Sequence, residues 1–344
     1  MTKKLRARRL RLTGFERQMR KRRSLIILAL TAIWIFAIAE RLLSFKGATA
    51  RPSAIAIPQP TTPQPKHVES YRPAVELARL QDPAITESSG IVASRANPGI
   101  YWTHNDSGDG PFIYAFDRTG KSRGVWRVTG ASARDWEDIA AGPGSDPHGT
   151  YLYVGDIGDN EGKRATIDIY RFIEPAIATE DSHATKYKPR STEPAEVIHL
   201  HYPDGRHDAE TLLVHPVSGD LYVITKEFLG KAGVYKAKAP LISAATVNMV
   251  YLGPLNLPTL LGGLVTGGDV SPDGRRVALC DYMQGYELVL AAGKSFDEIW
   301  KQPLKVLALG TRKQGEAIGY RLDGKALLTT SEGAHSPLIE IVRR

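Results

Sequence analysis

The sequence predicts an all-β fold, a β-propeller of five four-stranded blades, and three observations point to it. Short apolar runs alternate with Gly, Asp and Pro turns over most of the 344 residues, a pattern typical of β-strands. An acidic or small polar opening followed by an alternating apolar run recurs along the chain. Taking Ser89, Glu137, Glu210, Gly268 and Glu316 as equivalent positions, the spacings are 48, 73, 58 and 48 residues, about the length of a propeller blade.

The N-terminal tail, residues 1–23, carries eleven Lys or Arg and a single acid, Glu16. The rest of the chain has 34 basic and 36 acidic residues, so the formal net charge of +8 belongs to the tail alone. The remainder offers no positive surface for a polyanion, and we expect no nucleic-acid partner.

The apolar run that begins at Ser24 predicts a transmembrane signal anchor over residues 24–45. Basic residues before a span stay in the cytoplasm, so we expect a single-pass protein of the cell membrane with a periplasmic or extracellular globular part. A cleaved export signal is the alternative, because Ala37-Ile38-Ala39 and Ala48-Thr49-Ala50 are small-x-small sites. Both interpretations place the propeller outside the cytoplasm.

Residues 46–73 contain six prolines and predict a semi-rigid stalk, which leaves residues 74–344 for the propeller. The single cysteine, Cys280, excludes an internal disulfide and lies in an apolar run, where we expect inert packing.

Each expected blade begins with an inner strand. The fifth repeat lacks an outer strand, whereas "AVELARL" (74–80) stands alone before the first repeat. We therefore expect this N-terminal strand to complete the last blade and close the ring.

The 73-residue spacing between the second and third repeats contains a polar insertion, residues 178–194, which we interpret as a loop; a degenerate sixth blade is the alternative. The five openings are "TESSGIVAS" (86–94), "RDWEDIAAG" (134–142), "HDAETLLVHP" (207–216), "VTGGDVSPDG" (265–274) and "QGEAIGYRLDG" (314–324).

The inner strands of a propeller line a central channel, so equivalent residues of these strands converge on one axis. Ser89, Glu137, Glu210 and Glu316 would then form a ring of oxygen ligands. Carboxylates held this close repel one another unless a cation offsets the charge, and Ca²⁺ suits such a mixed shell of oxygens. The alternative is that these acids cap strands or face a water-filled channel that holds no ion.

These features resemble those of the calcium-activated nucleotidases, the soluble apyrases. The order Ser, Glu, Glu, small residue, Glu and the segments "ESSGI", "DAETL" and "GEAIG" are similar to the inner strands of that family. The resemblance implies a five-bladed propeller with a central Ca²⁺ and a nucleotide bound above it. Two departures are Gly268, where the family has a hydroxyl, and a phosphate-binding segment reduced to Lys226 and Glu227. Weaker similarities connect the chain to phytase-like, lactonase-like and TolB-type propellers.

The ends of the second strands supply a second layer of candidate residues. If the protein hydrolyses a phosphorylated small molecule, the ion would polarise phosphoryl oxygens and Asp106 or Asp156 would accept a proton from water. The alternative is that "HNDSGDG" and "GDIGDNEGK" are only turns. The remaining substrate-binding candidates are Asn105, Lys163, Arg164, Lys226, Asp281 and Glu332.

Two weaker metal signals remain. "NDSGDG" (105–110) fits the first half of a calcium loop, but the twelfth position is Phe116 and not an acid. His199 and His201 alternate onto one side of a strand, for which we expect solvated imidazoles on an outer strand rather than a metal site.

The sequence leaves two functions open. One is a membrane-tethered, Ca²⁺-dependent hydrolase of phosphorylated small molecules. The other is a non-catalytic scaffold that binds a protein, glycan or cell-wall partner, with the ion serving structure alone.

Overall fold

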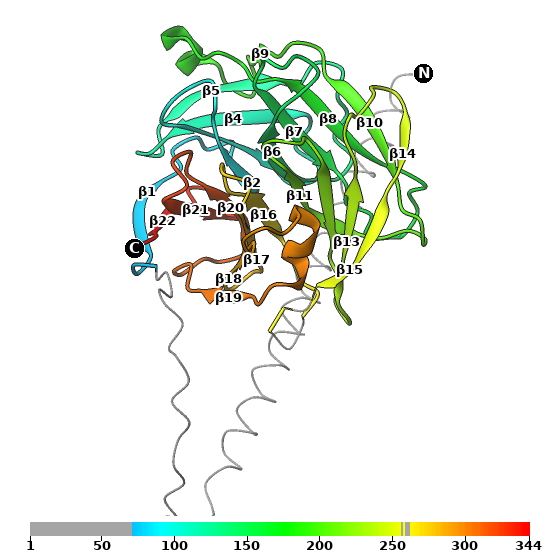
Figure 1. The fold of residues 1–344 in the computed structure, drawn as a ribbon. Coiled ribbons are helices and arrows are strands. Elements are labelled where there is room, and N and C mark those ends of the chain that lie inside the picture. The colour runs from blue at the N-terminus through cyan, green and yellow to red at the C-terminus, as the bar shows by residue number, and fades with distance from the viewer. Residues whose placement is uncertain (1–70, 256, 259–261) are drawn as a thin grey trace, which may run out of the picture. The chain divides into compact units, whose positions relative to one another are not determined.

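The strands of the computed structural model form five mainly antiparallel sheets, each of which is one blade of a propeller (Figure 1). The structure describes residues 71–344 except 256 and 259–261. The predicted basic tail, the anchor and nearly all of the stalk lie outside the described residues. No helix within the described part of the chain is long and apolar enough to cross a membrane.

Each of the first four blades follows the chain from its inner to its outer strand, in the order that the repeats predict. The first blade consists of β2 (Ser88–Ala93), β3 (Ile100–Asn105), β4 (Phe112–Asp117) and β5 (Ser122–Arg127). The second consists of β6 (Trp136–Gly142), β7 (Tyr151–Asp156), β8 (Ile167–Ile173) and β10 (Glu196–His201). The third consists of β11 (Ala209–Val214), β12 (Leu221–Thr225), β13 (Ala232–Ala237) and β15 (Val250–Leu255). The fourth consists of β16 (Gly267–Val270), β17 (Arg276–Cys280), β18 (Gly285–Val289) and β19 (Lys305–Leu307).

The fifth blade combines the two ends of the propeller. From the inner strand outward, its first three strands are β20 (Gly315–Tyr320), β21 (Ala326–Ser331) and β22 (Pro337–Val342). The outermost strand is β1 (Val75–Arg79), which pairs antiparallel with β22. The last blade therefore has a fourth strand drawn from the start of the described chain.

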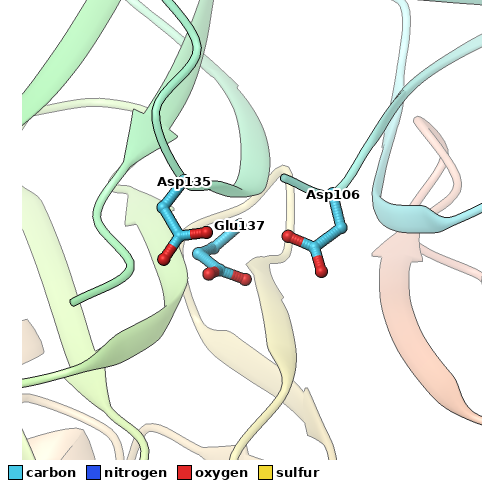
Figure 2. A group of neighbouring side chains, drawn as sticks. All are labelled: Asp106, Asp135 and Glu137. Atoms are coloured by element: carbon cyan, nitrogen blue, oxygen red, sulfur yellow. The ribbon is translucent and has the colours of Figure 1, made fainter. Parts of the chain in front are cut away.

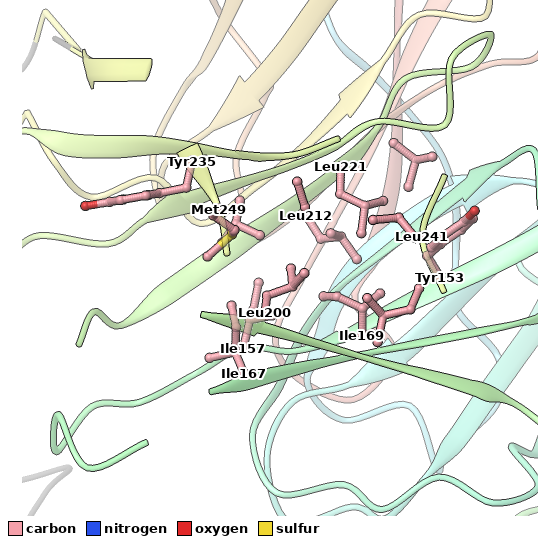
Figure 3. Close-up of a cluster of buried hydrophobic side chains, with 14 of the residues drawn as sticks. Tyr153, Ile157, Ile167, Ile169, Leu200, Leu212, Leu221, Tyr235, Leu241 and Met249 are labelled. Atoms are coloured by element: carbon pink, nitrogen blue, oxygen red, sulfur yellow. The ribbon is translucent and has the colours of Figure 1, made fainter. Parts of the chain in front are cut away.

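The five inner strands pack side by side as a closed ring, in the order β2, β6, β11, β16, β20 and back to β2. Five apolar clusters fill the five spaces between neighbouring blades. Figure 3 shows the cluster between the second and third blades, where Ile169 and Leu200 meet Leu212 and Leu221. Burying each such side chain contributes about 1.5–3 kcal/mol, so blade-to-blade packing holds the ring together.

The tryptophans and the cysteine lie in these interfaces. Trp102, Trp126 and Trp136 pack between the first and second blades. Cys280 is buried between the fourth and fifth blades, where burial raises the pKa of its thiol to about 11. A thiol protonated at neutral pH packs as a small apolar group.

Residues 178–194 form an insertion in the second blade and not a sixth blade. They contain a short 3₁₀ helix, η1 (Thr179–His183), and β9 (Arg190–Ser191), which pairs parallel with β5 of the first blade. The second 3₁₀ helix, η2 (Phe296–Lys301), precedes β19, and the Glu298 carboxylate accepts the backbone N–H of Ser295 at its start.

One predicted outer strand divides in two. The run "TVNMVYL" predicts one strand, but β14 (Thr246–Asn248) pairs with β10 of the second blade, whereas β15 pairs within the third. Met249 separates them because its side chain is buried between the two blades and its N–H bonds to the carbonyl of His201 at 2.9 Å.

Candidate metal centre

The four predicted metal ligands occupy the same structural position in four blades. Ser89, Glu137, Glu210 and Glu316 are each the extra residue of a β-bulge at the start of an inner strand, as the pairing registers show. A bulged residue leaves the hydrogen-bonded ladder, so its side chain is aimed differently from those of its neighbours. The repeat seen in the sequence is therefore a repeat of backbone geometry.

The fourth blade lacks this bulge. Gly267 pairs with Cys280 and Gly268 with Leu279 in unbroken register, so β16 has no extra residue. A Cβ on Gly267 would overlap the carbonyl of Glu316, which excludes any side chain there. The nearest hydroxyl before Gly268 in the sequence, that of Thr266, donates to the carbonyl of Gly315 at 2.9 Å.

Asp269, directly after Gly268, is the acidic side chain of this strand. Its carboxylate accepts the N–H groups of Val270 and Tyr320, at 2.8 and 2.7 Å, so it joins β16 to β20. The fourth blade thus contributes neither of these two side chains freely to the ring.

Three carboxylates form the acidic mouth of the ring, where the second strand of the first blade ends and the inner strand of the second blade begins (Figure 2). Asp106 follows β3, Asp135 precedes β6, and Glu137 is the bulged residue of β6. One ligand oxygen of each lies within 4.8 Å of the others, a separation that one cation could bridge. Asp106, expected as a proton acceptor, is thus also part of the acidic cluster.

The other ring glutamates face the same space. Glu210 forms an ion pair with Lys226, which follows β12. Glu137 and Glu316 are both repelled by the charge of Asp106 and both attracted by that of Lys226. Glutamates of three blades therefore interact with the same lysine.

The carboxyl groups at the mouth hold protons more strongly than usual. Burial, and then the negative charges of Asp135, Glu87 and Glu332, raises the pKa of Asp106 to about 6. Burial and neighbouring carboxylates also raise the pKa of Glu137 and of Glu316 well above the usual range. A bound cation would reverse these shifts, because it favours the charged form of each carboxyl.

One atom of the ring has no hydrogen-bond donor among the described residues. The side chain of Glu316 is 6% exposed, and its Oε2 is buried without a partner. A buried carboxylate oxygen with no donor costs free energy, and a cation is one group that satisfies it.

Asn105 and Asp156 end the second strands of the first two blades. Each side chain accepts two backbone N–H groups from the segment just before the inner strand of its own blade. The Asn105 Oδ1 accepts the N–H groups of Thr86 and Glu87, just before β2. The Asp156 carboxylate accepts those of Arg134 and Asp135, just before β6. Asp156, expected as a candidate proton acceptor, is thus committed to holding the segment that carries Asp135.

The three basic substrate-binding candidates lie in different surroundings. Lys163 pairs with Glu161 on an exposed surface, 2.7 Å away. Arg164 is buried and donates to Asp156 at 2.7 Å and to the carbonyl of Gly158 at 3.0 Å. Lys226 is the one of the three whose side-chain amine reaches the ring of carboxylates.

Of the last two substrate-binding candidates, Asp281 and Glu332, only Glu332 is close to the ring glutamates. Asp281 accepts the N–H groups of Met283 and Gln284 and the hydroxyl of Tyr286, so it organises its own turn. Glu332 lies close to Glu316, whose pKa its negative charge raises, after burial.

Neither weaker metal signal gathers its side chains around a common point. In "NDSGDG", Asn105 bonds to the segment before β2, whereas Asp109 bonds to Tyr114 and Lys186. His199 bonds to Asp168 at 2.6 Å on β10, the fourth strand of its blade, and His201 is exposed there.

Asp135 and Asp208 belong to the acidic mouth, although sequence reasoning did not assign either to the site. Asp208 raises the pKa of Asp135 and of Glu137, so its charge acts on the same cluster. The signal was present: Asp135 and Asp208 each stand two residues before a ring glutamate, as Asp-x-Glu.

Comparisons with known proteins identify no family for this chain. No protein-family description matches the sequence, and no curated protein does. Among solved structures, a chain of a nidogen/laminin complex is 16% identical, with 72% of this chain and 73% of that chain covered and a TM-score of 0.39. The function of this protein is therefore inferred from the residues at the mouth.

Proposed function

We propose that this protein is a ligand-binding propeller that holds a divalent cation, Ca²⁺ by its ligand chemistry, at the acidic mouth of its channel. The observation that carries the proposal is the approach of Asp106, Asp135 and Glu137 to within 4.8 Å. The buried, unpartnered Oε2 of Glu316 across the mouth supports it independently. Carboxylate-only ligation favours Ca²⁺ or Mg²⁺ over softer metals, and an irregular, open ring suits the flexible coordination of Ca²⁺.

The bound ion would prepare the mouth for an anionic partner. An ion between the blades neutralises the ring and leaves coordination positions open toward solvent, where a phosphate, a carboxylate or an acidic glycan group could bind. Few basic side chains surround the mouth, so the ion itself would supply most of the attraction. If the expected anchor is present, the partner is met outside the cytoplasm, in the periplasm or the extracellular space.

Calcium titration by isothermal calorimetry tests the proposal. We expect the wild type to bind one Ca²⁺, and Glu137→Gln and Asp135→Asn each to weaken binding at least about tenfold, which corresponds to about 1.4 kcal/mol. Glu161→Gln removes an exposed acid outside the cluster and should leave the affinity unchanged. Equal affinity in all four proteins would contradict the proposed centre.

Hydrolysis of a phosphorylated small molecule is the second candidate, and Asp106 favours it. Asp106 lies within 4.8 Å of Asp135 and Glu137, so a carboxylate oxygen that the ion leaves free could accept a proton from a water polarised by the metal. The test is phosphate release from nucleotides and phosphoesters with calcium present. Turnover that Asp106→Asn abolishes supports a hydrolase, whereas calcium binding with no turnover leaves the ligand-binding function alone.

A further inference from the structure

The acidic mouth already contains a positive charge, the side-chain ammonium of Lys226. Its backbone N–H is fixed by the carbonyl of Asp208 at 2.9 Å, just after β12. Its Nζ pairs with Glu210 and lies 5.7 Å from the centre of the Tyr282 ring. An ammonium between a carboxylate and an aromatic face is held by both charge and the ring quadrupole.

This ammonium acts on more than its direct partner. Its charge also attracts Glu137 on the second blade and Glu316 on the fifth, so three ring glutamates share one lysine. Arg164 also attracts Asp135, but its guanidinium is buried and bonded to Asp156. Lys226 is only partly buried and ends a flexible four-carbon chain, so it is able to move out of the ring.

We propose that Lys226 is a tethered counter-ion that a divalent cation must displace from Glu210 in order to complete the metal centre. This inference rests on the proposed function, because it describes how the same site is controlled. In the metal-free protein the ammonium partly neutralises the ring. When the ion enters, Glu210 exchanges the ammonium for the metal, and the ammonium moves toward solvent beside the new site.

Displacement has two consequences. The lysine competes with the ion, so the affinity for calcium is lower than the ring of carboxylates would otherwise give. The released ammonium then lies next to the bound metal, where it is available to pair with an anionic ligand. Cation binding and anion binding are therefore expected to strengthen each other, as linkage requires.

Calcium titrations of wild type, Lys226→Met and Lys226→Gln test the proposal, with melting curves to show that each protein is folded. Met keeps most of the apolar stem, whereas Gln keeps a donor for Glu210. Both variants should bind Ca²⁺ at least about tenfold more tightly than the wild type, a gain of about 1.4 kcal/mol. The matched control, Lys294→Met, removes a lysine from an exposed pair with Glu298 and should change nothing.

A small amine provides a second readout. In Lys226→Ala, ethylammonium chloride should compete with calcium and return the affinity toward the wild-type value, whereas it should not affect the wild type. Equal or weaker calcium binding in the two Lys226 variants would overturn the tethered counter-ion and leave the metal centre standing. Absence of binding in the wild type and in every variant would overturn both. Binding in the variants alone would support the counter-ion most strongly.

Discussion

Asp106 shows how a single residue connects the stability of this protein with its proposed ligand. Burial and the surrounding carboxylates raise its pKa to about 6, and Glu137 and Glu316 shift in the same direction. A carboxyl whose pKa is higher in the folded state stabilises the fold fully below its unfolded pKa. That stabilisation is lost as the pH rises through the folded pKa. The charged carboxylates of the mouth thus destabilise the fold at neutral pH unless a cation is bound.

The expected result is a melting temperature in EDTA that is higher near pH 5 than near pH 7.5. Calcium in excess should reduce this difference, because it stabilises the charged form and adds about 2.7 kcal/mol at a hundredfold excess over Kd. Differential scanning fluorimetry with and without calcium measures both effects. Asp106→Asn should flatten the pH dependence in EDTA, and an unchanged profile in that variant would contradict the assignment.

Asp269 should not share this dependence on calcium. Burial raises the pKa of Asp269 to about 7, but its carboxylate is held by the N–H groups of Val270 and Tyr320. Its contribution to the pH profile should therefore persist when calcium is added, which distinguishes it from Asp106.

At the scale of the strand, bulges decide which residues face the mouth. The equivalence of these positions was predictable, because an oxygen-bearing side chain recurs at the same offset before the apolar run in four repeats: Ser89, Glu137, Glu210 and Glu316. The regular register of β16 was not predictable, since nothing in "VTGGDV" separates a strand with a bulge from one without it. The role of Asp156 was also hidden, because it depends on two N–H groups some twenty residues earlier in the chain.

The turn after β7 packs directly against the acidic cluster. A Cβ on Gly158 would overlap the Glu137 Oε1 and the Asp135 Oδ2, both of which are the ends of movable side chains. Gly158→Ala should therefore displace these oxygens and weaken calcium binding roughly tenfold, about 1.4 kcal/mol, without unfolding the protein.

Calorimetry together with a melting curve checks this prediction. Gly155→Ala is the matched control, because its Cβ would meet Ile157 at 3.2 Å and not the carboxylates. If Gly158→Ala binds calcium as the wild type does, the two oxygens are not part of the metal centre.

At the scale of the whole molecule, the ring depends on packing between its first and last blades. Leu80 follows β1 and is fully buried with Tyr101 of the first blade and Leu328 and Leu338 of the fifth. Tyr71, before β1, donates to Glu287 of the fourth blade at 2.6 Å. The start of the described chain is thus bound to three blades.

Leu80→Ala should cost about 3 kcal/mol, the middle of the range for a buried leucine. Because the cavity opens between two blades, backbone amides of both the first and the fifth blade should exchange faster with deuterium. Hydrogen exchange with mass spectrometry measures this. Faster exchange confined to β1 would show that the closure does not hold the two blades together.

The number of blades and most inner strands follow from the sequence, since each repeat states its own strands and turns. The division of "TVNMVYL" between two blades does not, because it is decided by the burial of Met249 between them. The acidic mouth was predictable only in part. Its glutamates recur in the sequence, but the approach of Asp106 to Asp135 and Glu137 depends on how the first two blades pack in the ring.

Anomalous diffraction from crystals soaked in calcium or terbium tests the central claim most directly. A divalent cation at the mouth predicts one strong peak about 2.3–2.6 Å from carboxylate oxygens of Asp106, Asp135 and Glu137, the distance range of calcium ligands. A mouth that shows no peak at saturating metal, with Lys226 still paired to Glu210, would contradict it.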